Sequence, residues 1–137
     1  MKRNFFGILT AMTFALLISV PLSAQTIARV TVPFDFTVGQ TQMSAGTYEI
    51  NPLDHDAIVI RDTKAARSAL SIVRSERSRN SDSGTKLVFN RYGDKYFLSQ
   101  VSRGVGGGVM QLPTSKLEKE VRIASSDVTR KVVVAAK

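Results

Sequence analysis

The feature that most constrains the fold is a strict alternation of apolar and polar residues over positions 28–38. Every odd position in this run is polar or proline, and every even position is apolar: Ala28, Val30, Val32, Phe34, Phe36 and Val38. Successive side chains of a β-strand point to opposite faces, so the pattern predicts one buried and one solvated face. Pro33 has no N–H to donate, which predicts either an edge strand or a bend into two shorter strands.

Further short strands are predicted along the rest of the chain, each bounded by turn residues. They cover residues 47–51, 57–61, 68–73 and 132–134. Residues 51–52 and 54–56 have the composition of turns, and the polar residues 75–86 are predicted to be an exposed loop.

A β-hairpin is predicted around the Tyr-Gly-Asp-Lys segment, and the sequence leaves its register open. A two-residue loop would pair Phe89 with Leu98 and Leu87 with Gln100. A three-residue loop would pair Leu87 with Phe97 instead, so the two registers bury different side chains.

One helix is predicted near the C-terminus. Ser115 and Glu118 form a capping box, and Leu117, Val121 and Ala124 form one apolar stripe. With about six to eight short strands, the sequence predicts an all-β fold, mainly antiparallel: a small β-sandwich or barrel with one short C-terminal helix.

The first 24 residues are predicted to be a secretory signal peptide. Lys2 and Arg3 precede an uncharged apolar run at positions 5–20, and a Pro-Leu-Ser-Ala segment ends at Ala24. An uncleaved membrane anchor is the alternative, since about 18 apolar residues can span a bilayer. Cleavage would leave one domain of residues 25–137 in the periplasm or outside the cell, with no transmembrane span and a net charge of +6 instead of +8.

Composition argues against most catalytic and metal sites. The chain has no cysteine and a single histidine, His55, so no disulfide, cofactor or metal site is expected. Asp54 and Asp56 flank His55 and could hold a cation, but a turn is the simpler interpretation. The glycine-rich residues 103–108 lack the lysine and helix of a phosphate-binding loop and predict a hairpin loop. The sequence therefore predicts a protein that is not an enzyme.

Residues 61–79, termed the basic stretch below, are a candidate anion-binding site. Two acidic residues accompany six basic ones: Arg61, Lys64, Arg67, Arg74, Arg77 and Arg79. Such a cluster attracts phosphate or sulfate groups, but a solvated strand rim and loop is the alternative. The stretch has no aromatic residue on which bases could stack, so no specific nucleic acid is expected as a partner.

Three segments carry a family resemblance: VPFDFTVGQTQMSAGTY at 32–48, FNRYGDKYFLSQV at 89–101 and LPTSKLEKE at 112–120. Their order resembles the pattern VPFxFxVG, LPAGxY, FxRYGxxYFL and LPxSxxExE of an uncharacterised family of small secreted proteins from acidobacterial-type bacteria. The chain departs from it at Met43-Ser44, where Leu-Pro is usual. The resemblance implies a secreted β-rich domain and brings no activity with it.

Taken together, these patterns predict an exported, non-enzymatic β-domain with a structural or binding role. The first alternative is a binder of anionic surfaces, such as lipid headgroups, acidic polysaccharide or nucleic acid, through the basic stretch. The second is a small hydrolase that uses carboxylates such as Asp54 or Asp56. An outer-membrane barrel is disfavoured, because its strands need about 9–11 residues.

Overall fold

The computed structural model describes residues 26–77, 84–104, 106–125 and 129–136. These ranges contain eleven strands and one helix, more strands than the six to eight predicted, because four of them have only three residues. The elements are β1 (Ala28–Val32), β2 (Phe36–Val38), β3 (Thr41–Met43), β4 (Gly46–Asp54), β5 (Ala57–Asp62), β6 (Ser68–Ile72), β7 (Arg74–Glu76), β8 (Lys86–Tyr92), β9 (Lys95–Ser102), β10 (Val109–Gln111), α1 (Lys116–Ala124) and β11 (Arg130–Ala135).

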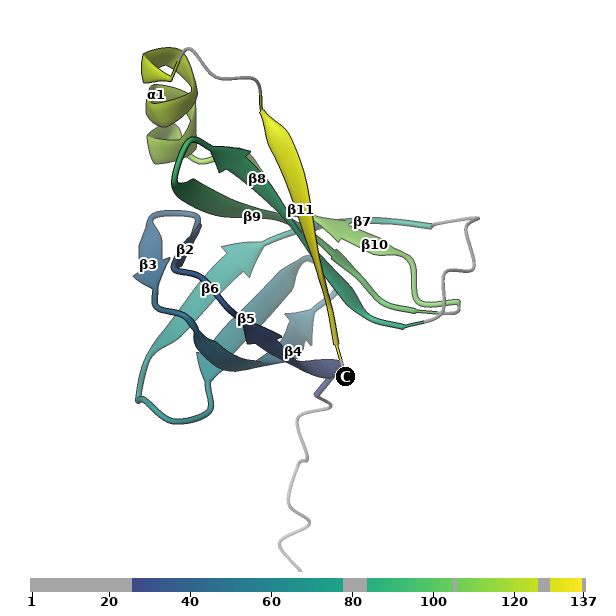
Figure 1. Ribbon diagram of the computed structural model, residues 1–137. Helices are drawn as coiled ribbons and strands as arrows, with labels where there is room; N and C mark the ends of the chain where they lie inside the picture. The colour runs from purple at the N-terminus through teal and green to yellow at the C-terminus, as the bar shows by residue number, and fades with distance from the viewer. Residues whose placement is uncertain (1–25, 78–83, 105, 126–128, 137) are drawn as a thin grey trace, which may run out of the picture.

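The strands form two sheets that curl into a half-barrel (Figure 1). The smaller sheet has the order β1-β4-β5-β6, and the larger has the order β11-β8-β9-β10-β7, with β2 and β3 attached beside β9. Only Val73 separates β6 from β7, so the chain passes directly from one sheet to the other. Every strand pair is antiparallel except β2 with β9, which confirms the predicted all-β class.

The alternating run at positions 28–38 forms two strands, as the second of the two interpretations of Pro33 predicts. A bend separates β1 from β2, and Val30, Val32, Phe36 and Val38 are all buried. The predicted solvated face fails at Thr37, which is also buried. β2 is paired on both edges, with β3 and with β9, and Thr37 lines a cleft whose wall Leu117 and Val121 of α1 also form.

The prediction of a turn at residues 51–52 is wrong, because both residues lie inside β4. β1 begins at Ala28, opposite Ile50, and therefore does not reach Pro52. The missing N–H of Pro52 consequently breaks no bond of the ladder, and a bulge follows before Asp54. The turn predicted at residues 54–56 is confirmed at His55-Asp56.

The first predicted register of the β8–β9 hairpin is correct near the turn and wrong beyond it. Phe89 pairs with Leu98, but Leu87 pairs with Val101 rather than with Gln100. The cause is a bulge at Ser99. The Ser99 carbonyl oxygen faces the opposite edge of β9, where it accepts a hydrogen bond from the Leu112 N–H at 2.8 Å.

The prediction that residues 75–86 form a loop is wrong at its ends, which belong to β7 and β8. Ser75 and Glu76 belong to β7, which pairs with β10. Residues 78–83 lie outside the described part of the chain. The glycine-rich residues 103–108 connect β9 to β10, which are antiparallel partners, so the predicted hairpin connection is confirmed.

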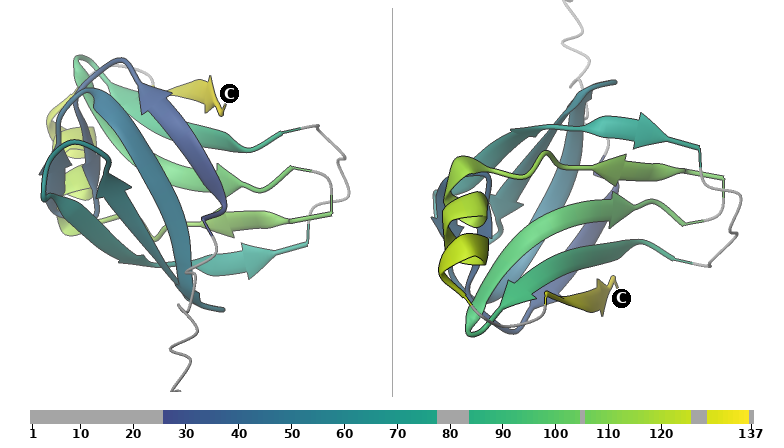
Figure 2. Two further views of the ribbon diagram at one scale, coloured as in Figure 1. Left: turned by 90° about the horizontal axis from the view of Figure 1, so that it is seen from below. Right: turned by 90° about the horizontal axis from the view of Figure 1, so that it is seen from above.

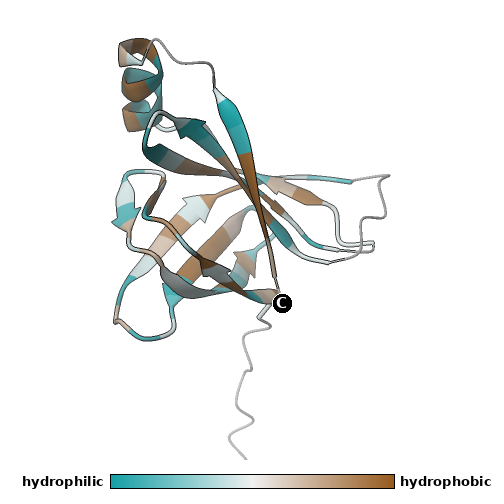
Figure 3. Cartoon of the chain, viewed as in Figure 1, coloured by the Kyte–Doolittle hydropathy of each residue, from teal (hydrophilic) through white to brown (hydrophobic). Residues whose placement is uncertain are grey.

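The core lies between the two sheets, where Phe36 makes edge-to-face contacts with Tyr48 and Phe89 at centroid distances of 5.1 and 5.3 Å. Figure 3 shows hydrophobic residues along β4, β5 and the C-terminal part of β11, with hydrophilic residues at the β5–β6 connection.

The helix begins where the capping box predicts but buries a different residue. Ser115 is the N-cap, and its Oγ accepts a hydrogen bond from the Glu118 N–H at 3.1 Å. Leu117 and Val121 are half-buried, whereas Ala124 is exposed and Glu118 is buried. The stripe prediction is therefore wrong at Ala124, because α1 packs on the outer side of the β8–β9 hairpin through Glu118 (Figure 2). In the described ranges, no helix is both long and apolar enough to cross a bilayer.

A candidate binding edge at the open seam of the half-barrel

The half-barrel is not closed by hydrogen bonds alongside β6, although β2 approaches this strand, and we call this edge of residues 68–72 the seam. The pairing of β10 with β7 ends at Gln111, opposite Arg74. If this register continued, Pro113 would face Ile72, but proline has no N–H to donate. β10 therefore pairs no further, and β6 hydrogen bonds only to β5 among the described strands.

The backbone register determines which groups of β6 point into the seam. The Val73 N–H donates to the Asp56 carbonyl at 2.8 Å, and the Asp62 N–H donates to the Arg67 carbonyl at 2.9 Å. Hydrogen-bonded pairs alternate along an antiparallel ladder, so Ala69 and Ser71 also bond to β5. The backbone N–H and C=O groups of the remaining residues therefore point into the seam. These residues are Ser68, Leu70 and Ile72.

The side chains of β6 divide in an unusual way between the two faces of the sheet. Ala69 and Ser71 are buried, whereas Leu70 is 64% exposed and Ile72 is 71% exposed. The strand therefore turns its small residues toward the core and its large apolar residues toward solvent. Two large apolar side chains beside an unpaired strand edge are typical of a surface that a partner covers.

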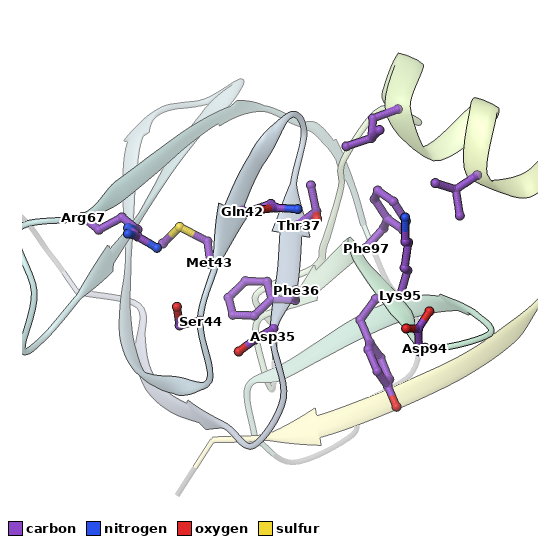
Figure 4. A pocket seen from close by; sticks show the side chains of 13 residues that line it. Asp35, Phe36, Thr37, Gln42, Met43, Ser44, Arg67, Asp94, Lys95 and Phe97 are labelled. Carbon is purple, nitrogen blue, oxygen red and sulfur yellow. The ribbon is translucent and has the colours of Figure 1, made fainter.

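A hollow lies at each end of the seam. At the start of β6, a cleft of about 270 Å³ lies between Arg67 and the β2–β3 hairpin, with Phe36 and Met43 in its wall (Figure 4). At the end of β6, a hollow of about 440 Å³ is lined by Ile72 and Val73 on one side and by Leu112 and Pro113 on the other.

The structure divides the basic stretch between the two ends of β6. Arg61 lies on β5 opposite Ser68, and Lys64 and Arg67 lie in the β5–β6 connection. Arg74 opens β7 and Arg77 follows it, whereas Arg79 lies outside the described residues. From Arg67 to Arg74 a strand spans roughly 23 Å, so the predicted site is not a single patch.

All five described cations of the basic stretch are exposed. Within the described ranges, the ion pair between Arg29 and Glu49 is the one that forms, and none of these five cations takes part in one. Their charges are therefore available to a partner.

Two carboxylates near Arg67 are held by backbone N–H groups, whereas Asp56 lines the hollow beside Arg74 and Glu76 accepts a hydrogen bond from the side chain of Gln111. Asp62 Oδ1 accepts hydrogen bonds from the N–H groups of Lys64 and Ala65 at 2.8 and 3.1 Å. These two bonds lower the pKa of the Asp62 carboxyl below its usual value, and the charge of Arg67 adds to the effect. Asp35 Oδ1 accepts from the Ala45 N–H at 2.7 Å.

The Asp54-His55-Asp56 turn lies at another opening, a cavity of about 520 Å³ that Arg74 and Arg103 also line. All three turn residues are exposed. Over the ranges that the structure describes, no group of three histidine, cysteine or acidic side chains is placed to hold a metal ion. The Nε atom of Arg103 is buried without a hydrogen-bond partner in these same ranges.

Sequence reasoning identified the cations at the seam but missed Leu70 and Ile72. The segment 68–73 was correctly predicted as a strand, and its alternation was visible. However, alternation alone places the larger apolar residues inside, whereas the structure places Ala69 and Ser71 inside. One feature of the sequence could have indicated the exposed apolar residues: small residues alternate with large ones in a strand that arginines flank.

The comparisons with known proteins add no relative. No family model, curated protein or solved structure matches this chain.

Proposed function

We propose that this chain is an exported, non-enzymatic β-domain that acts by binding, and that it belongs to the secreted family whose motifs it resembles. The seam carries the binding part of this proposal, because a strand edge that no described strand pairs with, two exposed apolar side chains, and cations without an ion pair in the described ranges lie along it. The export part rests on the charged start, the apolar run and the small-residue segment ending at Ala24.

Export is tested by expressing the full chain in a bacterial host and measuring the mass of the protein in each cell fraction. We expect the periplasmic or released fraction to contain a form that lacks residues 1–24. Substitution of Leu16→Arg with Leu17→Arg interrupts the apolar run and should leave the uncleaved chain in the cytosol. A native chain of full mass in the membrane fraction would support the retained anchor, and a native chain in the cytosol would contradict export.

Binding of anionic surfaces through the basic stretch is the second candidate function. It is favoured by the exposure of the five described cations and by their lack of ion pairs within the described ranges. Lipid headgroups and acidic polysaccharides both present such anions, and a steep loss of affinity with salt is the signature of this mode.

A polyanion column with a salt gradient tests this second function. We expect the native protein to elute at higher salt than the variant in which Arg74, Arg77 and Arg79 are changed to Glu. A matched variant reverses three exposed cations away from the seam: Lys119, Arg130 and Lys131. Equal elution of the two variants would show that only net charge matters, and the basic stretch would then be a solvated rim.

A further inference from the structure

We propose that the seam binds an extended acidic peptide segment, which adds to β6 as a further strand. This inference rests on the proposed binding function and names the class of partner. Strand addition uses the unpaired backbone groups of a sheet edge for affinity and the neighbouring side chains for selectivity.

The backbone of β6 is already in the conformation that strand addition requires. Its N–H and C=O groups at Ser68, Leu70 and Ile72 point away from β5, and no described strand pairs with them. The Ile72 carbonyl already accepts one hydrogen bond, from Ser71 Oγ at 3.1 Å, and has a second lone pair for a partner. A partner strand can therefore bond to them without breaking any bond of the β5–β6 ladder.

The side chains beside this edge favour a partner with alternating apolar residues. Leu70 and Ile72 continue an apolar surface on β5, where the half-buried Val59 and Ala57 are their cross-strand partners. On the added strand, alternate side chains would cover this surface. The side chains between them would point toward the hollows at the two ends of the seam.

The charges favour an acidic peptide rather than a second copy of this chain. Arg67 lies directly before β6 and Arg74 shortly after it, and carboxylates at both ends of a peptide would complement them. Two copies paired along this edge would instead bring two positively charged basic stretches together, and the repulsion between them disfavours that pairing.

The test uses a labelled synthetic peptide of about eight residues, long enough to reach from Arg67 to Arg74 at the rise of a strand. Its centre alternates Val and Thr, and Glu residues stand at both ends. Fluorescence anisotropy with the purified protein should show saturable binding that weakens as salt is added. Two control peptides should each bind roughly tenfold more weakly or not at all. One has Lys in place of Glu, and the other is N-methylated at alternate residues, which removes the N–H groups along one edge of the strand.

Variants of the protein separate backbone from side-chain effects. Leu70→Pro removes an N–H that faces the seam, together with the leucine side chain, and no bond to β5, so the domain should fold. Leu70→Ala loses the side chain alone, and Leu70→Pro should bind roughly threefold to tenfold more weakly than Leu70→Ala. Ile72→Thr retains the N–H and β propensity but removes apolar area, and should weaken binding independently. The cooperative thermal transition of each variant shows whether it folds.

Charge is tested by a matched pair of double variants. Arg67→Gln with Arg74→Gln removes the two cations that flank β6. Arg130→Gln with Lys131→Gln removes the same charge from β11, which lies at the opposite edge of the larger sheet from β7. The first pair should weaken peptide binding and reduce its salt dependence, whereas the second should have little effect.

Each outcome distinguishes this inference from the proposed function. Failure to bind the peptide, with salt-sensitive retention on the polyanion column intact, would overturn strand addition and leave the anionic-surface function standing. Failure in both assays would remove both. Peptide binding that is unchanged by Leu70→Pro and Ile72→Thr would overturn the assignment to β6. A dimer in sedimentation that Leu70→Pro dissociates would show that a second copy occupies the seam, and would also overturn the peptide proposal.

Discussion

The carboxylate of Glu118 is buried against the hydroxyl group of Tyr92, which donates a hydrogen bond to Glu118 Oε1 at 3.1 Å. The side-chain amide of Asn90 donates to the same oxygen at 2.9 Å. Both donors come from β8, so one buried acidic residue fastens α1 to the outer side of the hairpin. Tyr92 and Phe97 pack edge to face beside this bond, with ring centroids 5.9 Å apart.

Replacing Glu118 is expected to destabilise the domain more when the new side chain has no hydrogen-bond acceptor than when it keeps one. Glu118→Ala leaves the Tyr92 and Asn90 donors without their acceptor in a buried site and should lower the free energy of unfolding by about 2–3 kcal/mol. Glu118→Gln retains an acceptor oxygen and should lower it by only about 1 kcal/mol. Chemical denaturation measures both, and Glu120→Ala, at an exposed position on the same helix, is the control. Equal losses for the Ala variants at 118 and 120 would contradict the role of this bond.

Tyr92 makes stability depend on alkaline pH. Burial raises the pKa of the Tyr92 hydroxyl above its usual value near 10, and the neighbouring Glu118 charge and hydrogen bond raise it further. Because this folded-state pKa exceeds the unfolded one, the stabilisation is present in full below about pH 10 and is lost as the pH rises through the folded-state pKa. Tyr92→Phe should reduce the slope of stability against pH above about pH 10, measured by denaturant unfolding. The slope that remains is expected from Tyr48, whose pKa burial also raises. An unchanged slope would mean that Tyr92 ionises equally in both states.

Phe36 is expected to be among the most sensitive core positions. It is 2% exposed and contacts the rings of both Tyr48 and Phe89, one from each sheet. Phe36→Ala should therefore lower the free energy of unfolding by about 3–5 kcal/mol through lost burial and the cavity that remains. Leu70→Ala is the matched control, because Leu70 is 64% exposed. A melting temperature that Phe36→Ala leaves unchanged would refute the packing of the two sheets around this ring.

Much of the fold could be predicted from the sequence because local rules and tertiary packing agree there. Alternation located β1 and β2, β-branched residues located β5, and the Ser115 cap located the start of α1. The prediction failed where a neighbouring segment decided the outcome. The bulge at Ser99 has no signal in β8 or β9 alone, and the short strands β7 and β10 pair with each other while β10 also pairs with β9.

The candidate site was predictable in its charges and not in its geometry. The arginines of the basic stretch are visible in the sequence, but their separation to the two ends of β6 depends on the crossing between sheets at Val73. The free edge depends on Pro113, 41 residues after Ile72, which ends the pairing of β10 before it reaches Ile72. Such relationships between distant segments have no local signal.

Gly107 is expected to be irreplaceable in the β9–β10 connection for a reason that glycine content alone does not reveal. A Cβ atom at this position would lie 2.2 Å from the carbonyl oxygen of Arg103 and 2.4 Å from its Cβ, far inside van der Waals contact. The Arg103 N–H donates to the Gly108 carbonyl at 3.0 Å, so the backbone on both sides of the clash is already fixed. Gly107→Ala should therefore displace the loop and destabilise the domain by about 1–3 kcal/mol.

Gly39→Asn is the matched control, because Gly39 has a φ of 61° but open space where a Cβ would lie. Asparagine tolerates this left-handed conformation, so Gly39→Asn should change the free energy of unfolding by less than about 1 kcal/mol. Denaturant unfolding of the two variants compares a steric requirement for glycine with a conformational one, and equal stability would show that the connection relaxes around the added methyl group.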